Sequence, residues 1–460
     1  MTKLQRVGIV LALLSIWTVR ADDETYAARP KGTLTFTKDI APIVYKNCTG
    51  CHRTGEVAPF TLQSYQDVSK RAKQITRVTH SRYMPPWKAE PGFGEFLDER
   101  RLSSDQIGMI KQWAEEGTVE GSAKDLPPTP KYGDGWVLGE PDMVVKMPEA
   151  YTLAAEGRDV FRCFVIPIKI DQDKFVTAVD YKPGNRKIVH HAIFYLDNMG
   201  NARKKDEADP GPGFASFGGP GFTPTGALGG WAPGYSPRML QEGMGKSLKK
   251  GSDLVMQIHF HPSGKEEKEQ STVALYFAKK PVNKVIVSLP IANRKIDIPA
   301  GEKAYKVTQS YTTPIDVEIV GITPHAHYVC KDMKVNATLP DGKKQPLIWI
   351  KDWDFSWQDQ YLYRTPLKFP AGTTLSMEYT YDNSADNPRN PSTPPQHVKF
   401  GEQTKDEMAF AFINFVSPFG DIGIANREAI RQRIRDALSG KVPTPPNPGD
   451  KKPDEKKDGK

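Results

Sequence analysis

The chain has 460 residues, of which 38% are hydrophobic and 10% aromatic, so it is long enough for two or three domains and apolar enough for sizeable cores. Glycine and proline are plentiful, at 38 and 39 residues, which favours a β-rich architecture with many loops over a helical bundle. The net charge of +8 is mild for this length and its charges are scattered, so nucleic acid is not indicated as a partner.

Residues 1–21 have the pattern of a secretory signal peptide. Basic residues begin the segment, an apolar stretch follows at 7–19, and small residues stand at its end, where a signal peptidase reads. An uncleaved anchor is the alternative, but the stretch is shorter than the roughly 20 residues that a span needs. Cleavage removes three cations and no acid, which lowers the net charge to +5. We expect an exported protein, periplasmic or extracellular, with no transmembrane segment after signal removal.

Residues 30–122 are expected to form a small all-α domain. Its first helix should begin close to Asp39, because Pro42 is tolerated only in a first turn. Its last helix should start at a capping box that opens at Ser103, and should stop at Gly117.

A proline-containing linker at 123–140 separates this domain from a region with a different pattern. Short alternating runs there predict two all-β sandwiches, at 141–290 and 291–420. The runs lie at 160–170, 175–181, 188–196, 253–260, 273–277, 317–322 and 408–416.

The segments between and after these runs carry further expectations. Pro-Gly-Asn at 183–185 predicts a hairpin turn between two of the runs, and the Gly/Pro-rich segment 210–234 predicts a long loop. Residues 421–440 are expected to include a helix, and the Pro- and Lys-rich tail 441–460 is expected to be disordered.

The sequence Cys-Thr-Gly-Cys-His at 48–52 is the attachment motif for a c-type haem. The Cys48 and Cys51 thiols would form thioethers with the haem vinyl groups, and His52 would ligate the iron from the same side. A surface disulfide or half of a zinc site would leave His52 unexplained, and the chain has no second C-x-x-C. Covalent haem c is therefore the expected cofactor of this domain.

The second axial ligand is less constrained by the sequence. Met84 is the preferred candidate, because the prolines that follow it would stiffen the loop that presents its sulfur. His80 is the competitor, and Met109 falls within the last helix, where core packing is the default. Residues 30–122 resemble a class I cytochrome c over their whole length.

The other seven histidines lie later in the chain, and six of them occur in three clusters. The clusters are His190-His191, His259 with His261, and His325 with His327, while His397 is isolated. An H-x-H pair on a strand puts both imidazoles on one face, whereas an adjacent pair needs a bulge, or the use of different ring nitrogens, to converge. Imidazole suits copper, zinc and iron, and a thioether ligand would tilt the choice to copper, above all Cu(I).

Four motifs resemble the copper type II, ascorbate-dependent monooxygenases, the family of peptidylglycine α-hydroxylating monooxygenase and dopamine β-monooxygenase. They are Val189-His190-His191-Ala192, Val255-Met-Gln-Ile-His259-Phe260, Pro324-His325-Ala-His327 and Asp406-Glu-Met408, in the family's order and approximate spacing. The resemblance covers about 150–420. It implies two jelly-roll-like sandwiches that face each other across a solvent-filled cleft.

The resemblance also implies two copper ions with separate ligands. The positions that match the electron-transfer copper are His190, His191 and His259, and those that match the oxygen-binding copper are His325, His327 and Met408. Gln257 matches a polar residue of the family's cleft, and Met333 is an alternative sulfur ligand.

The sequence departs from the family pattern at several positions. His261 has no clear counterpart and could lie behind the ligands or on the surface, and Cys163 and Cys330 could pair or stay apart. The positions that grip a peptide carboxylate in the peptidylglycine enzyme are here neutral and mostly apolar, namely Thr323, Phe410 and Phe412. A neutral or largely apolar small-molecule substrate is therefore expected.

The resemblance implies a monooxygenase that inserts one atom of O₂ into a substrate C–H bond. An external reductant or redox protein would supply electrons, which the cytochrome c domain would deliver to the coppers. A non-catalytic electron-transfer or copper-binding haem protein is the alternative. A zinc hydrolase is a weaker one, since it explains neither Met408 nor the haem motif.

Overall fold

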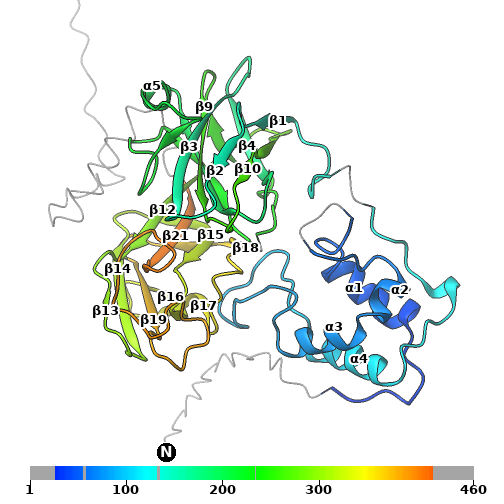
Figure 1. Cartoon of the computed structure of the whole chain (residues 1–460). Coiled ribbons are helices and arrows are strands. Elements are labelled where there is room, and N and C mark those ends of the chain that lie inside the picture. The colour runs from blue at the N-terminus through cyan, green and yellow to red at the C-terminus, as the bar shows by residue number, and fades with distance from the viewer. Residues whose placement is uncertain (1–25, 55–57, 132–134, 234, 418–460) are drawn as a thin grey trace, which may run out of the picture. The chain divides into compact units, whose positions relative to one another are not determined.

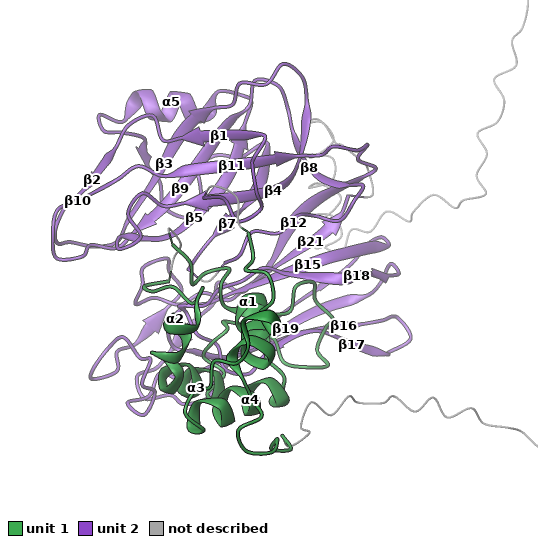
Figure 2. Ribbon diagram, turned by 90° about the vertical axis from the view of Figure 1, so that its right-hand side faces the viewer, with its two compact units in different colours: residues 1–131 green, residues 132–460 purple. Residues whose placement is uncertain are grey.

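The computed structural model describes residues 26–54, 58–131, 135–233 and 235–417. The chain divides into two compact units, residues 1–131 and 132–460, which are coloured separately in Figure 2 and are described one at a time below. The expected signal peptide at 1–21, helix at 421–440 and disordered tail at 441–460 lie outside the described residues.

The first unit is helical. It contains η1 (Phe36–Ile40), α1 (Ala41–Asn47), α2 (Tyr65–Ser69), α3 (Ala72–His80), α4 (Ser104–Glu115) and η2 (Ala123–Asp125). The first helical turn begins at Phe36, three residues before the predicted start, because Thr35 caps it and the Asp39 carboxylate reaches back to the Thr35 N–H at 2.9 Å. Pro42 lies in the first turn of α1, as expected.

Helix α4 begins and ends where the sequence predicts. The Ser103 hydroxyl accepts from the Gln106 N–H, and the Gln106 side chain accepts from the Ser103 N–H, which forms the capping box. Gly117 follows with a φ of +97°, a left-handed conformation that suits glycine after a helix. Trp113 anchors α4 in the core of the unit. Within the described residues, no helix is long and apolar enough to cross a membrane.

The regular structure in the described part of the second unit is all strand except for one helix, α5 (Asn201–Ala208) (Figure 1). Its earlier strands are β1 (Met143–Lys146), β2 (Tyr151–Leu153), β3 (Val160–Pro167), β4 (Lys174–Lys182), β5 (Val189–Asp197), β6 (Phe214–Ala215), β7 (Gly226–Trp231), β8 (Met244–Leu248), β9 (Asp253–Phe260), β10 (Glu267–Glu269) and β11 (Thr272–Phe277). Its later strands are β12 (Lys284–Ala292), β13 (Asp297–Ile298), β14 (Tyr305–Thr312), β15 (Val317–His325), β16 (Cys330–Thr338), β17 (Lys344–Ile350), β18 (Tyr361–Phe369), β19 (Thr374–Tyr381), β20 (Val398–Lys399) and β21 (Phe410–Val416).

The earlier strands make the first β-sandwich. One layer has the order β1-β11-β4-β8, and the other has the order β6-β3-β9-β5-β7. Apolar residues of both layers meet in one core, which includes Val179 and Leu275 from the first layer and Phe164, Phe194 and Met256 from the second. The second layer is buried on both faces around β9, where every residue is buried, because a smaller core that includes Cys163, Val255 and Ala202 of α5 covers its other face.

The later strands make the second β-sandwich, with layers β12-β21-β15-β18 and β14-β19-β16-β17. The Tyr379 hydroxyl of β19 donates to the Phe410 carbonyl of β21 at 2.7 Å, which links the two layers through a buried polar contact. Strand β12 pairs with β21 along most of its length and with β8 at its start, so one eight-stranded sheet runs through both sandwiches. The expected boundary at 290/291 falls inside β12.

Two loop predictions were wrong. The 183–185 turn does not close a hairpin, because β4 pairs with β11 and β8 while β5 pairs with β9 and β7. The turn carries the chain from one layer to the other, and the buried Glu269 carboxylate accepts from the N–H groups of Gly184 and Asn185. The segment 210–234 is not all loop, since β6 and β7 within it pair with β3 and β5.

Lys246 of β8 is an unexpected amine in the first sandwich. Its Nζ donates to the Leu228 carbonyl at 2.8 Å, and burial lowers the pKa of Lys246 to about 8. In the unfolded chain this amine has a pKa of about 10.4. The free energy of unfolding therefore decreases as pH falls from about 10.4 to about 8, because only the unfolded state takes up the proton in that range.

Replacing Lys246 with Met should therefore stabilise the protein at pH 7 by about 1–3 kcal/mol, and the gain should shrink towards pH 10.5. Urea denaturation at the two pH values measures the free energy of unfolding. Lys268→Met, at an exposed position of β10, is the control and should show no such pH-dependent gain. A gain of equal size at both pH values would contradict the assignment of a buried amine.

Candidate functional site

The haem-attachment segment begins where α1 ends. Cys48 caps the helix, and the N–H groups of Cys51 and His52 both donate back to the Cys48 carbonyl, at 3.2 and 2.9 Å. This tight turn keeps the two thiols and the imidazole on one short stretch of chain. The His52 Nδ1 lies 3.1 Å from the Phe60 carbonyl, which fixes that nitrogen as a donor and leaves Nε2 for an iron. The segment therefore fits the group that its motif predicts.

The three candidates for the second axial ligand differ in environment. Met84 is partly buried, and its N–H donates to the Val78 carbonyl of α3 at 3.0 Å, which ties the methionine loop to the helix. His80 is exposed as the last residue of α3. Met109 packs against the core of the unit, as the sequence suggested. The contacts favour Met84 as the residue held in place by the fold.

In the second unit, His190, His191 and His259 come together on β5 and β9. His259 lies directly opposite His191, and the pairing shifts by one residue between Val189 and His191. This shift is the bulge that an adjacent histidine pair was expected to need. One ligand atom from each of the three residues lies within 4.8 Å of the others.

The spacing of the first two imidazoles suits one ion. The Nδ1 atoms of His190 and His191 are 3.1 Å apart. Two nitrogens bound to a tetrahedral metal at about 2.0–2.1 Å would be about 3.3 Å apart. The third ring is held by Phe161, which stacks on His259 with ring centroids 4.1 Å apart. The three histidines therefore form a credible nitrogen-donor set.

His325 and His327 stand at the end of β15, and each has its Nδ1 engaged. The His325 Nδ1 lies 2.6 Å from Gln358 Oε1, and the His327 Nδ1 lies 2.9 Å from the Asp406 carbonyl. These acceptors fix both rings as Nδ1–H tautomers, so Nε2 is the free nitrogen of each. An outer acceptor that orients a ligating histidine in this way is a regular feature of metal sites.

The Met408 backbone is fastened to the His327 backbone by Glu407. One Glu407 oxygen accepts from the N–H groups of His327 and Met408, at 2.8 and 3.2 Å, and the other accepts from Val329. Burial raises the pKa of Glu407 to about 8 against the lowering effect of these N–H donors. The Tyr381 hydroxyl also donates to the Met408 carbonyl at 2.7 Å. Met333, the alternative sulfur, is fully buried in β16 among core residues.

The two histidine sets lie against each other in the second unit. The ring centroids of His191 and His325 are 6.4 Å apart. The ring of Phe355 stacks on His190, with centroids 4.5 Å apart, and its centroid lies 5.4 Å from that of His327. The resemblance had led us to expect a solvent-filled cleft between the sets. Here Phe355 contacts a histidine of each set and so occupies part of that space.

Burial keeps these imidazoles neutral. It lowers the pKa of His325 to about 4 and that of His327 to about 3, with a further contribution from neighbouring histidines, and it holds the pKa values of His190 and His191 well below the usual range. Neutral imidazole is the form that binds metal, so the pocket presents lone pairs at physiological pH.

Residues that the sequence did not single out complete the surroundings of the histidines. They are Asp159, Phe161, Phe355, Gln358 and Glu407. Glu407 belongs to the Asp-Glu-Met motif and could have been found there. Asp159, Phe355 and Gln358 carry no local signal, because they reach the site only through the fold.

His261 lies behind the ligands, while His397 lies elsewhere on the surface. The His261 Nδ1 is 2.7 Å from Asp159 Oδ1, and the other oxygen of Asp159 is 3.1 Å from His259 Nε2. Burial raises the pKa of Asp159, but the contacts with His259, Thr404 and His261 outweigh it and hold that pKa well below its usual range. His397 is exposed and pairs with Asp297 at 2.9 Å.

Cys163 and Cys330 do not pair. Both are buried free thiols, Cys163 on β3 of the first sandwich and Cys330 on β16 of the second. Burial raises the pKa of the Cys163 thiol to about 12 and that of Cys330 well above its usual range. Neither thiol is in the nucleophilic thiolate form at neutral pH.

The positions expected to meet a substrate line one side of the second histidine set. Phe410 lies opposite His325 across β15 and β21, and Phe412 lies opposite Thr323. Residues directly opposite each other project from the same face of a sheet. The rings of Phe410 and Phe412 stack 5.6 Å apart, which makes this wall apolar.

Gln257 holds a loop at the edge of the first histidine set. Its side-chain amide donates to the carbonyls of Ser216 and Gly219, at 3.0 and 3.1 Å. A hollow of about 340 Å³ next to this loop is bounded by Asp159, Phe161 and Phe217.

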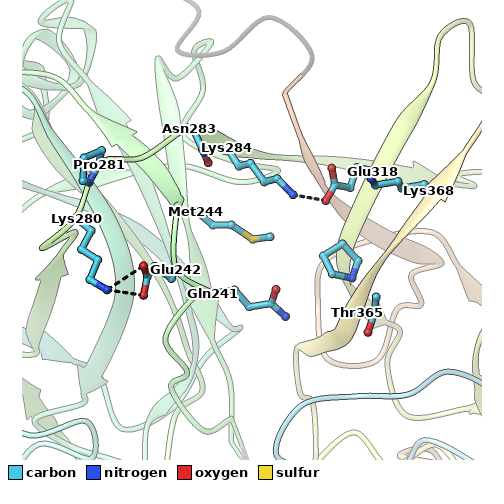
Figure 3. A pocket seen from close by; sticks show the side chains of 12 residues that line it. Gln241, Glu242, Met244, Lys280, Pro281, Asn283, Lys284, Glu318, Thr365 and Lys368 are labelled. Carbon is cyan, nitrogen blue, oxygen red and sulfur yellow. Dashed lines mark hydrogen bonds and ion pairs between the residues drawn. The ribbon is translucent and has the colours of Figure 1, made fainter.

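A larger hollow of about 580 Å³ lies between β8, β12, β15 and β18 (Figure 3). Lys284 pairs with Glu318 at 2.6 Å, and Lys280 pairs with Glu242 at 2.8 Å, so its main charges are already matched. No histidine or cysteine is among its lining residues.

Comparisons with known proteins leave the family open. No family model matches the chain, and no curated protein matches it. Among solved structures, PNGF-II is similar with a TM-score of 0.29 and 10% identity over 60% of this chain and 65% of that one, just under two thirds of its length. The major capsid protein P2 of bacteriophage PM2 gives a TM-score of 0.24 and 9% identity over 60% of this chain and 99% of that one. Likenesses this low assign neither a family nor a function.

Replacing Met84 with Ala should remove the sulfur-to-iron absorption band of the purified protein and leave the haem attached, because the Cys48 and Cys51 thioethers are untouched. The spectrum of the oxidised protein and a haem stain of the denatured chain measure the two properties. His80→Ala is the control and should keep the band. A band that survives in Met84→Ala would assign the ligand elsewhere.

Replacing Met408 with Ala should lower Cu(I) affinity at the His325–His327 site by about tenfold or more, because a thioether selects the reduced ion. The His190–His191–His259 site should keep its copper. Competition against a Cu(I) chelator measures both affinities, and Met199→Ala, at an exposed methionine, is the matched control. Equal loss at both sites would show that Met408 acts through the fold and not as a ligand.

Proposed function

We propose that this protein is an exported copper- and haem-dependent monooxygenase. The observation that carries the proposal is the meeting of two histidine sets from the two sandwiches, with the ring centroids of His191 and His325 6.4 Å apart. His325 and His327 have their outer nitrogens fixed, and all five rings are held neutral or close to it by burial. Such a pocket suits two soft, nitrogen-binding redox ions.

The roles of the residues follow from their contacts. His190, His191 and His259 would hold the electron-transfer copper, and His325, His327 and Met408 would hold the oxygen-binding copper. When bound, the two ions would each supply one electron and the second would activate O₂. Gln358, the Asp406 carbonyl and Glu407 keep the second ligand set oriented. Phe355 packs against His190 of the first set and His327 of the second.

The overall reaction balances as a hydroxylation. The substrate C–H bond and O₂, with two electrons and two protons, give the hydroxylated product and water. Thr323, Phe410 and Phe412 carry no charge that could pair with a substrate carboxylate, so we propose a neutral or largely apolar substrate. Desolvating an unpaired carboxylate there would be costly.

The first unit would carry the external electrons. We propose that residues 30–122 are a class I cytochrome c with haem c on Cys48 and Cys51, His52 and Met84 as axial ligands, and an external reductant or redox protein as donor. The two sandwiches would then be the jelly-roll-like domains of the copper monooxygenases. A haem supplies one electron at a time, which matches metal centres that each store one.

A non-catalytic electron-transfer or copper-binding protein is the alternative. A pure carrier needs closed coordination at each metal, whereas three protein ligands in each set leave room for O₂ or substrate. A zinc hydrolase would leave both the Met408 loop and the haem motif without a purpose. Metal analysis of protein from its native host decides between these, since the proposal requires two coppers per chain and no stoichiometric zinc.

Copper-reconstituted protein supplied with a one-electron reductant should show additional O₂ consumption when a neutral apolar substrate is present, and glycine-extended peptides should be turned over at least about 100-fold less efficiently, because an unpaired buried carboxylate costs several kcal/mol. An oxygen electrode, with product identified by mass, measures this over a panel of amines, phenols and aliphatics. His325→Ala should abolish the substrate-dependent part. Efficient hydroxylation of such a peptide would refute the substrate assignment, and no substrate-dependent consumption by any compound would favour the carrier.

Stopped-flow mixing of fully reduced protein with O₂ and substrate should show haem oxidation at the rate of turnover. The rate should stay first order on dilution, because the linker holds both units in one molecule. A haem that stays reduced while product forms would show that the first unit does not feed the reaction.

A further inference from the structure

Asp159 lies directly before β3 and makes three contacts that no local sequence motif predicts. Its side chain is only 7% exposed. One oxygen lies 3.1 Å from His259 Nε2, although the ring is not aligned for a linear hydrogen bond. The other oxygen lies 2.7 Å from the Nδ1 of His261, whose side chain is 58% exposed.

The third contact crosses to the second sandwich. The oxygen that faces His259 also accepts from the Thr404 N–H at 3.0 Å and from the Thr404 hydroxyl. Thr404 belongs to the loop 401–407, which is closed by a bond from the Gly401 N–H to the Glu407 carbonyl at 3.2 Å. The Asp406 carbonyl of the same loop accepts from His327 Nδ1 at 2.9 Å.

A continuous set of contacts therefore joins the two histidine sets. It runs from His259 through Asp159 and Thr404 to the loop that orients His327 and leads into Met408. Because Asp159 occupies the Nε2 side of His259, Nδ1 is the nitrogen left to bind a metal. A carboxylate behind a ligating histidine fixes its tautomer and raises its basicity.

We propose that Asp159 is a positioning residue shared by both metal sites, which orients His259 directly and the His327–Met408 loop through Thr404. This inference rests on the proposed copper function. It predicts that one carboxylate affects two separate ions, which an ordinary surface ion pair between Asp159 and His261 would not do. Coupling of this kind would keep the two ligand sets in register when a ligand enters the pocket.

Two backgrounds separate the effects on the two sites. In His325→Ala/His327→Ala, only the three-histidine site remains, and in His190→Ala/His191→Ala, only the His325–His327–Met408 site remains. Adding Asp159→Asn should lower copper affinity about 10–100-fold in the first background and change the Cu(II) hyperfine spectrum, as loss of an outer carboxylate does. In the second background it should lower Cu(I) affinity severalfold.

Thr404→Val isolates the second arm, because it removes only the hydroxyl contact. It should weaken the His325–His327–Met408 site and leave the Cu(II) spectrum of the other site nearly unchanged. Asp159→Glu keeps the charge and should recover part of both losses. Asp297→Asn, which breaks the exposed pair with His397, is the matched control and should change neither site.

The outcomes separate this inference from the function on which it rests. If the parent protein binds two coppers and Asp159→Asn alters neither the affinity nor the spectrum, Asp159 is no positioning residue although the proposed function stands. If the parent protein binds no copper, both the positioning role of Asp159 and the proposed function are contradicted. Should Asp159→Asn fail to fold, Thr404→Val decides the coupling through the Thr404 hydroxyl, since the N–H bond to Asp159 remains: an unchanged second site overturns that part of the inference.

Discussion

The packing of five imidazoles side by side, with His259 and His327 buried and the other three half-buried, is the constraint around which the second unit is arranged. A buried histidine is stable only if it stays neutral and its outer nitrogen has a partner. Gln358 and the Asp406 carbonyl meet that need for one set, while Asp159 stands behind His259 in the other. The same contacts leave one nitrogen of each of these three rings without a protein partner, so the contacts that stabilise the histidines also leave nitrogens that could bind a metal.

The sandwiches supply the rigidity that such a pocket demands. His191 and His259 lie on neighbouring strands of a packed layer, and His325 ends a strand whose partner carries Phe410. Glu407 then fastens the Met408 backbone to the His327 backbone through its carboxylate. Ligands placed on paired strands are held more closely than ligands on free loops.

Sequence periodicity was enough to place β3, β4, β5, β9, β11, β15 and β21, and cap chemistry was enough to place α4, because both depend on neighbours within a few residues; the other strands carry no alternating run that was recognised. The bulge at His190 could also be inferred, since two adjacent imidazoles cannot share a face on a regular strand. The 183–185 turn was misread because a tight turn says nothing about which layer receives the next strand. The contacts of Asp159 and Gln358 could not be predicted from the sequence, because their partners lie far away along the chain.

The course of β12 bears on how this protein can be divided. Its first residues pair with β8 of one sandwich and the rest pair with β21 of the other, so backbone hydrogen bonds cross the junction. A fragment that ended at 290 or began at 291 would cut this strand and leave unpaired sheet edges, which recruit other chains. We therefore expect the two sandwiches to fold and to be expressed only as one piece.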